Sequence, residues 1–218
     1  MTSKAELGAI RVLIADDHAI LRRGLRQIIE ETDDLIVVGE AESSAQTLQH
    51  IRNNPCDVVL LDISMPDRNG MDTLGIIIRD HPKVAVLMLS TYPESQYAVR
   101  ALRGGAAGYL NKQSAPAQLV TAIRQVATGK KYVTPAVAEE LARHVQTGSD
   151  RPPHELLSNR EYQTMCMIAA GRTVSEIAQQ LSLSVKTVSV YRARILAKLG
   201  VTSNAAIAHY AIKNKLVE

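Results

Sequence analysis

Five short apolar runs alternate with amphipathic stretches between residues 11 and 127, and this alternation limits the possible fold more than any other feature of the chain. Residues 84–89, for example, are apolar throughout. A run of this length without a polar side chain is typical of a strand covered on both faces, as in a parallel sheet between two layers of helices. The expected strands are residues 11–15, 35–39, 58–61, 84–89 and 107–110.

Each apolar run is followed by a stretch in which apolar residues recur at helical spacing. The expected helices are residues 19–31, 43–53, 71–80, 94–103 and 115–127. A strand, a helix and a parallel strand in succession connect through a right-handed crossover. We therefore predict an α/β doubly wound, five-stranded parallel sheet of the flavodoxin-like kind.

A second domain is expected after residues 147–153, where Gly, Ser, Asp and a Pro-Pro pair favour an extended, exposed connection. A helix at residues 134–146 precedes this connection. The predicted limits are residues 1–131 for the first domain, 132–153 for a linker helix and linker, and 154–218 for the second domain.

Capping residues place four helices in the second domain. They are Ser158 and Thr173, each with a Glu three residues later, then Ser184 before residues 185–199 and Ser203 before residues 204–214. Ser or Thr followed by Glu at this spacing is typical of a capping box. With a tight turn at residues 182–184, this pattern predicts a small all-α domain that contains a helix-turn-helix.

Charge and composition narrow the class of protein. Residues 152–218 carry eight Lys or Arg against four Asp or Glu, whereas the rest of the chain carries 17 against 18. A basic second domain suits DNA, although ordinary solvated surfaces also carry such a surplus.

Without a signal peptide or a long apolar run, we expect a cytoplasmic protein that does not contact a membrane. Cys56 and Cys166 are far apart and are expected to be reduced and buried.

Polar side chains follow the apolar runs, at the edge where ligands collect in a doubly wound sheet. They are Asp16 and Asp17 after the first run, Asp62 after the third, Ser90 after the fourth and Lys112 after the fifth. Three carboxylates at one edge repel one another unless a cation lies between them. Their oxygen atoms favour a hard divalent ion, most plausibly Mg²⁺.

Such a site suits phosphoryl transfer. Asp62 would act as the nucleophile, while the metal ion and the Lys112 ammonium neutralise charge on the transferred oxygens. The Ser90 hydroxyl would donate to the resulting aspartyl phosphate, and the movement of Ser90 would affect Tyr109.

A plainer interpretation of the same residues stays open. Asp16 and Asp17 also suit a loop ahead of a helix, and Lys112 suits a solvated surface charge. We favour the joint interpretation because matching groups follow four different strands. His18 suits the start of the helix better than a metal ligand, because the neighbouring oxygen donors favour Mg²⁺ over zinc.

The second helix of the helix-turn-helix has two distinct faces. Packing against the first helix would involve Ile177, Ala178, Leu181, Val188, Ile195 and Leu199. This leaves Lys186, Ser189, Val190 and Ala193 on the opposite face, flanked by Arg192 and Arg194. Small side chains suit a close approach to base edges, and arginines suit phosphates. The alternative is a helical oligomerisation or docking domain.

The motifs of the first domain resemble the receiver domain of two-component response regulators over residues 10–130. They are Asp16-Asp17-His18, Asp62 with Met65-Pro66 and Gly70, Ser90, and Gly108-Tyr109-Leu110 before Lys112. The resemblance implies that Asp62 accepts a phosphoryl group from a sensor histidine kinase. It also implies that Asp17 binds Mg²⁺ directly, Asp16 through water and Ser64 by its backbone carbonyl. Ser90 and Tyr109 correspond to the switch positions.

The second domain resembles the LuxR-type DNA-binding domain, so the whole chain is similar to the NarL/FixJ family. The residues are Leu157-Ser158-Asn159-Arg160-Glu161, Ala170-Gly171, Glu176-Ile177-Ala178, and Lys186-Thr187-Val188 through Lys198-Leu199-Gly200-Val201. The run Tyr191-Arg192-Ala193-Arg194 resembles the subgroup of global regulators typified by GacA and UvrY. The implied DNA contacts are Lys186, Thr187, Ser189, Val190, Tyr191, Arg192, Ala193 and Arg194.

A homodimer on DNA is the expected assembly, with the last helix as its contact through Ala205, Ala208 and Ile212 and the neighbouring Ala211. Packing within the domain is an equally open role for this helix. Two other classes of protein share some of these features. A phosphohydrolase would need an acid at position 64, where the chain has Ser64, so no enzyme is expected. A receiver that is never phosphorylated would usually lack one of the acids or the lysine.

Overall fold

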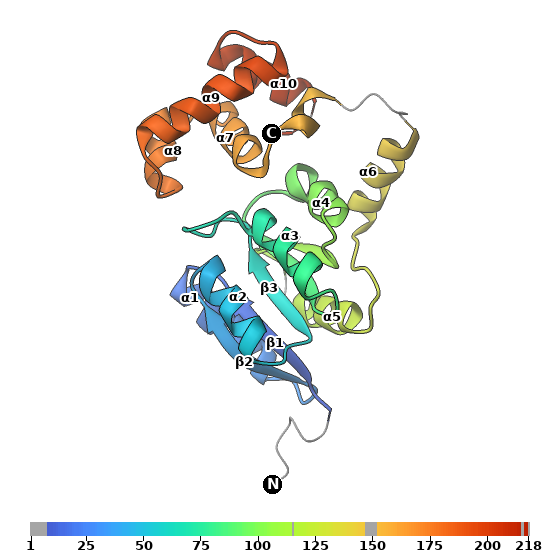
Figure 1. The fold of residues 1–218 in the computed structure, drawn as a ribbon. Helices are drawn as coiled ribbons and strands as arrows, with labels where there is room; N and C mark the ends of the chain where they lie inside the picture. Colours follow the sequence, from blue (N-terminus) through green and yellow to red (C-terminus); the bar gives the residue numbers. More distant parts are fainter. Residues whose placement is uncertain (1–7, 115, 147–151, 215, 218) are drawn as a thin grey trace. The chain divides into compact units, whose positions relative to one another are not determined.

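The computed structural model describes residues 8–114, 116–146, 152–214 and 216–217 (Figure 1). Ala115 and residues 147–151, at the expected helix start and connection, lie outside the described residues. The chain divides into two compact units between Ala138 and Glu139. In the part of the chain that is described, no helix combines the length and the apolar composition needed to cross a bilayer.

The first unit contains the predicted five-stranded parallel sheet. The strands are β1 (Ile10–Ala15), β2 (Leu35–Ala41), β3 (Val58–Asp62), β4 (Ala85–Ser90) and β5 (Gly108–Asn111). Their order is β2-β1-β3-β4-β5, and every neighbouring pair is parallel. The strand order reverses between β1 and β3. Ligands bind beyond the carboxyl ends of the strands at such a point, and the acidic residues lie at the ends of these two strands.

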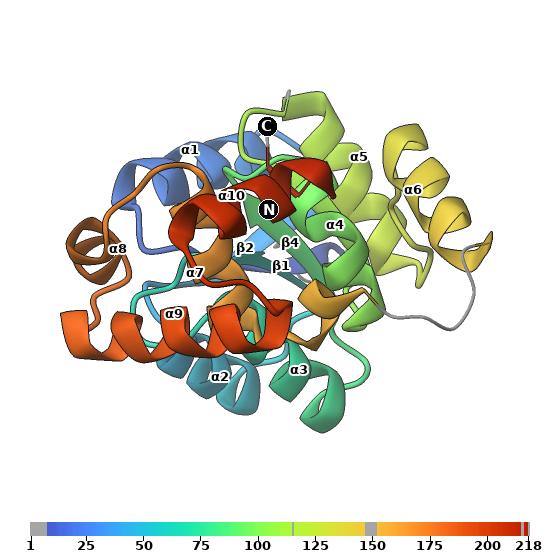
Figure 2. The same ribbon diagram turned by 90° about the horizontal axis from the view of Figure 1, so that it is seen from above.

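Helices cover both faces of this sheet, as the prediction requires. They are α1 (Ala19–Glu30), α2 (Ser44–Asn53), α3 (Gly70–Asp80), α4 (Glu94–Arg103) and α5 (Pro116–Ala127). Figure 2 shows α1 and α5 on one side of the sheet and α2 and α3 on the other.

Alternate strand residues supply the two hydrophobic cores, because successive side chains of a strand point to opposite faces. Leu60 and Leu87 pack with Leu25 of α1 and Ile123 of α5 in one apolar cluster. Leu61, the residue after Leu60 on β3, is also fully buried, and its side chain faces the other helix layer. Continuous apolar runs therefore indicate a sheet that helices cover on both faces. The structure confirms the predicted fold class.

Two strand ends differ from the prediction in a way that matters for the site. Asp62 and Ser90 were expected just after their strands, but each is the last residue of its strand. The ladder continues because Asp62 lies opposite Leu89, and Ser90 lies opposite Asn111. Regular strand backbone thus holds both polar side chains at the edge of the sheet.

The first unit extends past the expected limit at residue 131. The Tyr132 N–H donates to Ala107 O, and Tyr132 forms a parallel bridge with Gly108 at the start of β5. The Thr134 hydroxyl donates to the Glu94 carboxylate in the first turn of α4. Helix α6 (Pro135–Gln146) begins directly after this contact.

The second unit is all helical, with capping at the predicted residues. It contains η2 (Pro153–Leu156), α7 (Asn159–Ala169), α8 (Val174–Gln180), α9 (Val185–Leu199) and α10 (Asn204–Lys213). Both predicted capping boxes form, at Ser158 and at Thr173. Ser184 and Ser203 accept hydrogen bonds from backbone N–H groups of the helices they begin. The short 3₁₀ helix η2 was not predicted, and of its four residues only Pro153 fell within the expected connection.

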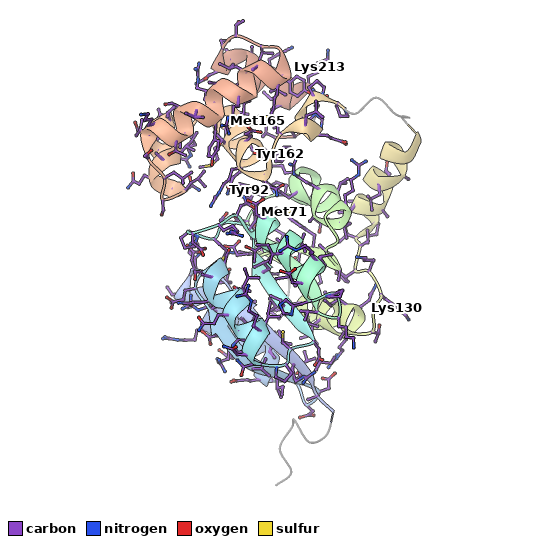
Figure 3. The ribbon with its side chains drawn as sticks, viewed as in Figure 1. Met71, Tyr92, Lys130, Tyr162, Met165 and Lys213 are labelled. Atoms are coloured by element: carbon purple, nitrogen blue, oxygen red, sulfur yellow. The ribbon has the colours of Figure 1, made fainter. Side chains whose placement is uncertain are left out.

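Helices α8 and α9 form the helix-turn-helix. Ser182 follows Leu181, the C-cap of α8, with a φ of 53°, and the Leu183 N–H donates to Ala178 O. This left-handed residue makes the turn tight. All six apolar residues that were predicted to pack the two helices are buried. Helices α8 and α9 both contact α7, whose Tyr162 and Met165 are also buried (Figure 3).

Candidate functional site

Asp16 and Asp17 lie at the end of β1, at the position where the strand order reverses. Asp16 is fully buried, and its Oδ1 accepts a hydrogen bond of 2.9 Å from the His18 backbone N–H. The Asp17 side chain is one-third exposed. One carboxylate is therefore held by the fold while its neighbour faces solvent.

Lys112 joins two strands of the sheet through their carboxylates. Its Nζ lies 2.6 Å from Asp16 Oδ2 and 2.9 Å from Asp62 Oδ2. All three side chains are at least nine-tenths buried. The Lys112 N–H also donates to Ser90 O, so the backbone places the ammonium next to β4. The lysine is a buried partner of the acids rather than a solvated surface charge.

The charge of this cluster is not balanced by Lys112 alone. Burial and the nearby Asp16 raise the pKa of Asp62, although Lys112 opposes the rise. For Lys112, burial lowers the pKa, but attraction to Asp62 and Asp16 outweighs it and the net shift is upward. A site in which carboxylates outnumber the cation has room for further positive charge.

The donors suit a hard cation. Asp16, Asp17, His18 and Asp62 can each offer one ligand atom within 4.8 Å of the others. Among the described residues, Asp16 Oδ2 and Asp62 Oδ2 share one ionic partner, the Lys112 ammonium. Two buried carboxylate oxygens that share a single cation fit a further oxygen-seeking ion such as Mg²⁺.

His18 begins α1 but does not cap it with its side chain. Its Nδ1 lies 2.7 Å from Asp17 Oδ1 and 3.2 Å from Asp16 Oδ1. The imidazole thus contacts the acidic pair, and its backbone N–H holds Asp16 in place.

Ser90 and Tyr109 are linked through Tyr92, which sequence reasoning did not single out. The Tyr92 N–H donates to Ser90 Oγ at 3.0 Å, and the Tyr109 hydroxyl donates to Tyr92 O at 2.8 Å. Asn111 Nδ2 also donates to Tyr92 O. Tyr109 is buried, and burial raises the pKa of its phenol. Figure 3 shows Tyr92 beyond the carboxyl ends of the strands.

The loop after Asp62 is fastened to helix α2 by Asp67, a second residue that sequence reasoning missed. Its two carboxylate oxygens accept hydrogen bonds from the backbone N–H groups of Ser44 and Ala45, each at 2.9 Å. Burial would raise the pKa of Asp67, but these hydrogen bonds lower it. Ser64, the predicted carbonyl ligand, lies half-buried in this loop.

Asp62 makes the stability of the metal-free protein depend on pH. Folding raises its pKa above the ordinary value of 3.8, so the folded state binds more protons. The stabilising contribution is complete below pH 3.8 and is lost as the pH rises through the raised pKa. Asp62→Asn should therefore gain stability relative to the wild type as the pH rises.

Urea unfolding in EDTA at pH 5 and pH 8 tests this expectation. Taking the difference between Asp62→Asn and the wild type removes the opposite contributions of carboxyls whose pKa is lowered, such as Glu40 and Glu161. Adding Mg²⁺ should shrink the difference, because the ion stabilises the charged carboxylate. A difference that is the same at both pH values would contradict the expectation.

The outer face of α9 carries the residues predicted to contact DNA. Lys186, Ser189, Val190, Ala193 and Arg194 are exposed, and the other three predicted residues, Thr187, Tyr191 and Arg192, are partly buried. Thr187 lies at the capped start of the helix, where its N–H donates to Ser184 Oγ. Arg192 Nε donates to Asn204 Oδ1 at 2.6 Å, so this arginine is oriented by the start of α10.

Lys198 fixes α9 to its own domain, a role that the charge pattern did not indicate. Its Nζ donates to Glu161 Oε2 at 2.6 Å and to Leu156 O at 3.1 Å. Burial would raise the pKa of Glu161, but Lys198 and the capping N–H of Ser158 lower it. This basic residue therefore packs α9 against α7 and η2.

Helix α10 divides into two faces that separate its two possible roles. Ile207 and Ala211 are fully buried within the second unit. Ile212 is 58% exposed and Ala205 is also exposed, while Ala208 is partly buried. Ala211, expected beside the dimer stripe, thus packs within the domain instead, whereas Ala205 and Ile212 remain exposed.

The two units match two family models. Residues 12–124 match the response regulator receiver domain, and residues 155–211 match the luxR family of bacterial regulatory proteins. The chain belongs to the response regulators that join a receiver domain to a LuxR-type DNA-binding domain.

Similar proteins span almost the whole chain. UvrY, a response regulator of Escherichia coli K12, is 38% identical over 208 residues, which are 95% of each chain. GacA of Pseudomonas viridiflava is 38% identical over 96% of this chain and 98% of its own. These two relatives agree with the resemblance seen in the recognition helix.

Solved structures give the same assignment. RcsB from Salmonella enterica serovar Typhimurium, bound to promoter rprA in the presence of the phosphomimetic BeF₃⁻, has a TM-score of 0.63 and 28% identity. That comparison covers 93% of this chain and 98% of RcsB. ChrA, a response regulator of a heme-sensing two-component system, has a TM-score of 0.51 and 31% identity over 96% of this chain and 99% of its own.

Proposed function

We propose that Asp62 accepts a phosphoryl group from a sensor histidine kinase, and that its phosphorylation controls DNA binding by α9. The observation that carries the proposal is the buried cluster in which Lys112 contacts Asp62 and Asp16 at the switch point of the sheet. A structural lysine would need one carboxylate partner. Two buried carboxylates and a third beside them make a site for cation and phosphate.

Four residues would hold Mg²⁺ in this proposal. Asp17 and Asp62 would bind it by their carboxylates, Ser64 by its backbone carbonyl and Asp16 through water. When bound, the ion would neutralise negative charge on the phosphoryl oxygens. The acidic pair and the loop that Asp67 holds to α2 would keep these ligands oriented before the phosphodonor arrives.

The chain's own residues carry the transfer. A carboxylate oxygen of Asp62 forms the new bond to phosphorus as the bond to the donor's histidine nitrogen breaks, and that nitrogen keeps the electron pair. The Lys112 ammonium stabilises charge on the transferred oxygens. The Ser90 hydroxyl, which now accepts from the Tyr92 N–H, would turn to donate to the phosphate. Tyr92 would pass this movement to Tyr109, because its N–H donates to Ser90 and its carbonyl accepts from the Tyr109 hydroxyl.

DNA recognition is proposed for the outer face of α9. Lys186 and Arg194 would contact phosphates, while Ser189, Val190 and Ala193 approach base edges. The structure of RcsB, a structural relative, has been solved with promoter DNA bound, and we extend DNA binding to this chain. Two copies would bind two half-sites through the stripe that contains Ile212 of α10. Binding to chromosomal DNA implies action in the cytoplasm.

We propose no turnover of a separate substrate. A phosphohydrolase with an aspartate nucleophile would need an acid two residues after Asp62, and Ser64 cannot act as a general acid. The same position suits a carbonyl ligand, which any residue supplies.

The direct test measures intact-protein mass after incubation with acetyl phosphate and Mg²⁺. The wild type should gain one phosphate, and Asp62→Ala should gain none. The same samples are then titrated with a double-stranded oligonucleotide enriched from a random pool on the phosphorylated protein. Phosphorylated wild type should bind more tightly than Asp62→Ala. A wild type that gains no phosphate while still binding this DNA would overturn the proposed control.

Ile212→Asp separates dimer formation from DNA contact. The side chain is exposed, so the substitution should leave the domain folded. We expect the shifted complex on a two-half-site oligonucleotide to be lost, with binding to a single half-site retained. An unchanged two-site complex would rule out this stripe as the dimer contact.

A further inference from the structure

Arg22 is a buried cation next to the acidic pair, and none of the roles described above uses it. It lies one turn into α1, and its side chain is only 7% exposed. Its Nη1 donates a buried hydrogen bond of 2.7 Å to Asp16 O. Arginine is almost never buried to this degree unless it is paired, so its surroundings need an explanation.

The contact with Arg22 completes the fixing of Asp16. The Asp16 N–H donates to Ala41 O at 3.0 Å, and its carboxylate is held by the His18 N–H and by Lys112. The carbonyl is the remaining polar group of this residue, and Arg22 binds it. That carbonyl belongs to the peptide that joins Asp16 to Asp17. The guanidinium therefore sets the plane from which the Asp17 carboxylate projects.

Two carboxylates on the far side of the guanidinium offset its charge. Glu40 Oε2 lies 3.2 Å from Nε, and Glu42 Oε1 lies 2.6 Å from Nη2. An uncompensated guanidinium beside a divalent cation would repel it. Because Glu40 and Glu42 lie at and beyond the end of β2, the neighbouring strand supplies this compensation. The planar fork of arginine can bind a carbonyl and two carboxylates at once, which lysine cannot do.

We propose that Arg22 is a positioning residue of the cation site: it orients the Asp16-Asp17 peptide while Glu40 and Glu42 cancel its charge. The inference rests on the proposed function, since it concerns the ion that the acidic pair would bind. Arg22 does not touch the phosphoryl group. Outer partners of metal ligands typically change metal affinity by about 10-fold to 100-fold when they are removed.

The sign of the effect distinguishes positioning from charge. Arg22→Met removes a positive charge near the site, so a purely electrostatic role predicts tighter cation binding. A positioning role predicts the opposite, and we expect about 10-fold weaker binding. Arg22→Lys keeps the charge and can reach Asp16 O but not all three partners. It should recover part of the affinity.

The measurement is Mn²⁺ binding to the full chain, followed by electron paramagnetic resonance without a phosphodonor. Arg26→Met is the matched control, because Arg26 lies on the same helix and donates to the same Glu40 but makes no contact with Asp16. It also removes a positive charge that is paired with Glu40, so it should bind Mn²⁺ no more weakly than the wild type. In a second measurement, the Mg²⁺ concentration for half-maximal phosphorylation by acetyl phosphate should rise for Arg22→Met. The rate at saturating Mg²⁺ should stay within about 3-fold of the wild type, since positioning is restored once the ion is bound.

Glu42→Gln keeps the inference testable if both Arg22 variants unfold. Glu42 is 64% exposed, so the variant should fold, and it leaves the guanidinium only partly neutralised. We expect Mn²⁺ binding about 3-fold weaker than in the wild type. Equal or tighter binding by Arg22→Met, or unchanged binding by Glu42→Gln where the Arg22 variants unfold, would overturn the inference. A wild type that binds no Mn²⁺ would instead overturn the proposed cation site itself.

Discussion

Lys112→Met should slow phosphorylation of Asp62 by acetyl phosphate by about 100-fold or more. The ammonium lies 2.9 Å from Asp62 Oδ2 and would contact the transferred oxygens. Removing it also takes away the group that holds down the pKa of Asp62, which burial and Asp16 already raise. Its loss would shift Asp62 further toward the protonated form, which cannot attack. Raising the pH should recover part of the rate, and that part measures the effect on the nucleophile.

The initial rate of adduct formation by intact-protein mass, at pH 6, 7 and 8 with saturating Mg²⁺, tests this prediction. Lys130→Met is the matched control, because Lys130 is exposed and lies toward the opposite end of the sheet (Figure 3). It should react like the wild type. If Lys112→Met reacted within a few-fold of the wild type at every pH, the ion pair would be structural and the proposed role in transfer would be wrong.

Gly70→Ala should have the largest effect on stability, with a loss of about 3 kcal/mol in the free energy of unfolding. A Cβ at position 70 would lie 1.9 Å from Asp62 O and 2.9 Å from Ile63 Cα. Both are backbone atoms at the strand end that carries Asp62, the proposed phosphate acceptor, so no side-chain rotation can relieve the clash. The Gly70 N–H also donates to Ile63 O, which ties α3 to this strand end. The variant must separate the two and displace Asp62.

Gly75→Ala is the internal comparison, since Gly75 lies on the same helix and a Cβ there meets nothing within 4 Å. It should stabilise the protein by about 0.5–1 kcal/mol, because alanine favours helix over glycine. Urea unfolding followed by far-ultraviolet circular dichroism gives both values. Coincident unfolding curves for the two variants would show that the strand end tolerates the extra methyl group, contrary to the prediction. Gly70→Ala should also accept phosphate more slowly at urea concentrations where it remains folded.

The fold class was predictable because its determinants repeat locally along the chain. Apolar runs such as residues 84–89 mark strands that are buried on both faces, and Ser158 and Thr173 mark helix starts through neighbours only three residues away. Boundaries were less certain, since Asp62 and Ser90 extend their strands by pairing with residues of neighbouring strands. Such pairing depends on the sheet and not on the residue itself.

The sequence by itself determined which polar groups follow the strands and therefore which could meet at the edge of the sheet. Only the tertiary structure decided how they pair. Lys112 contacts both acids because strand order places β1, β3 and β5 around one edge. Lys198 and Arg22 look like ordinary surface charges in the sequence, yet one binds a buried glutamate 37 positions away and the other binds the backbone of the acidic pair. Charged side chains are exposed by default, and only the packing of distant segments shows which of them are enclosed and what they bind.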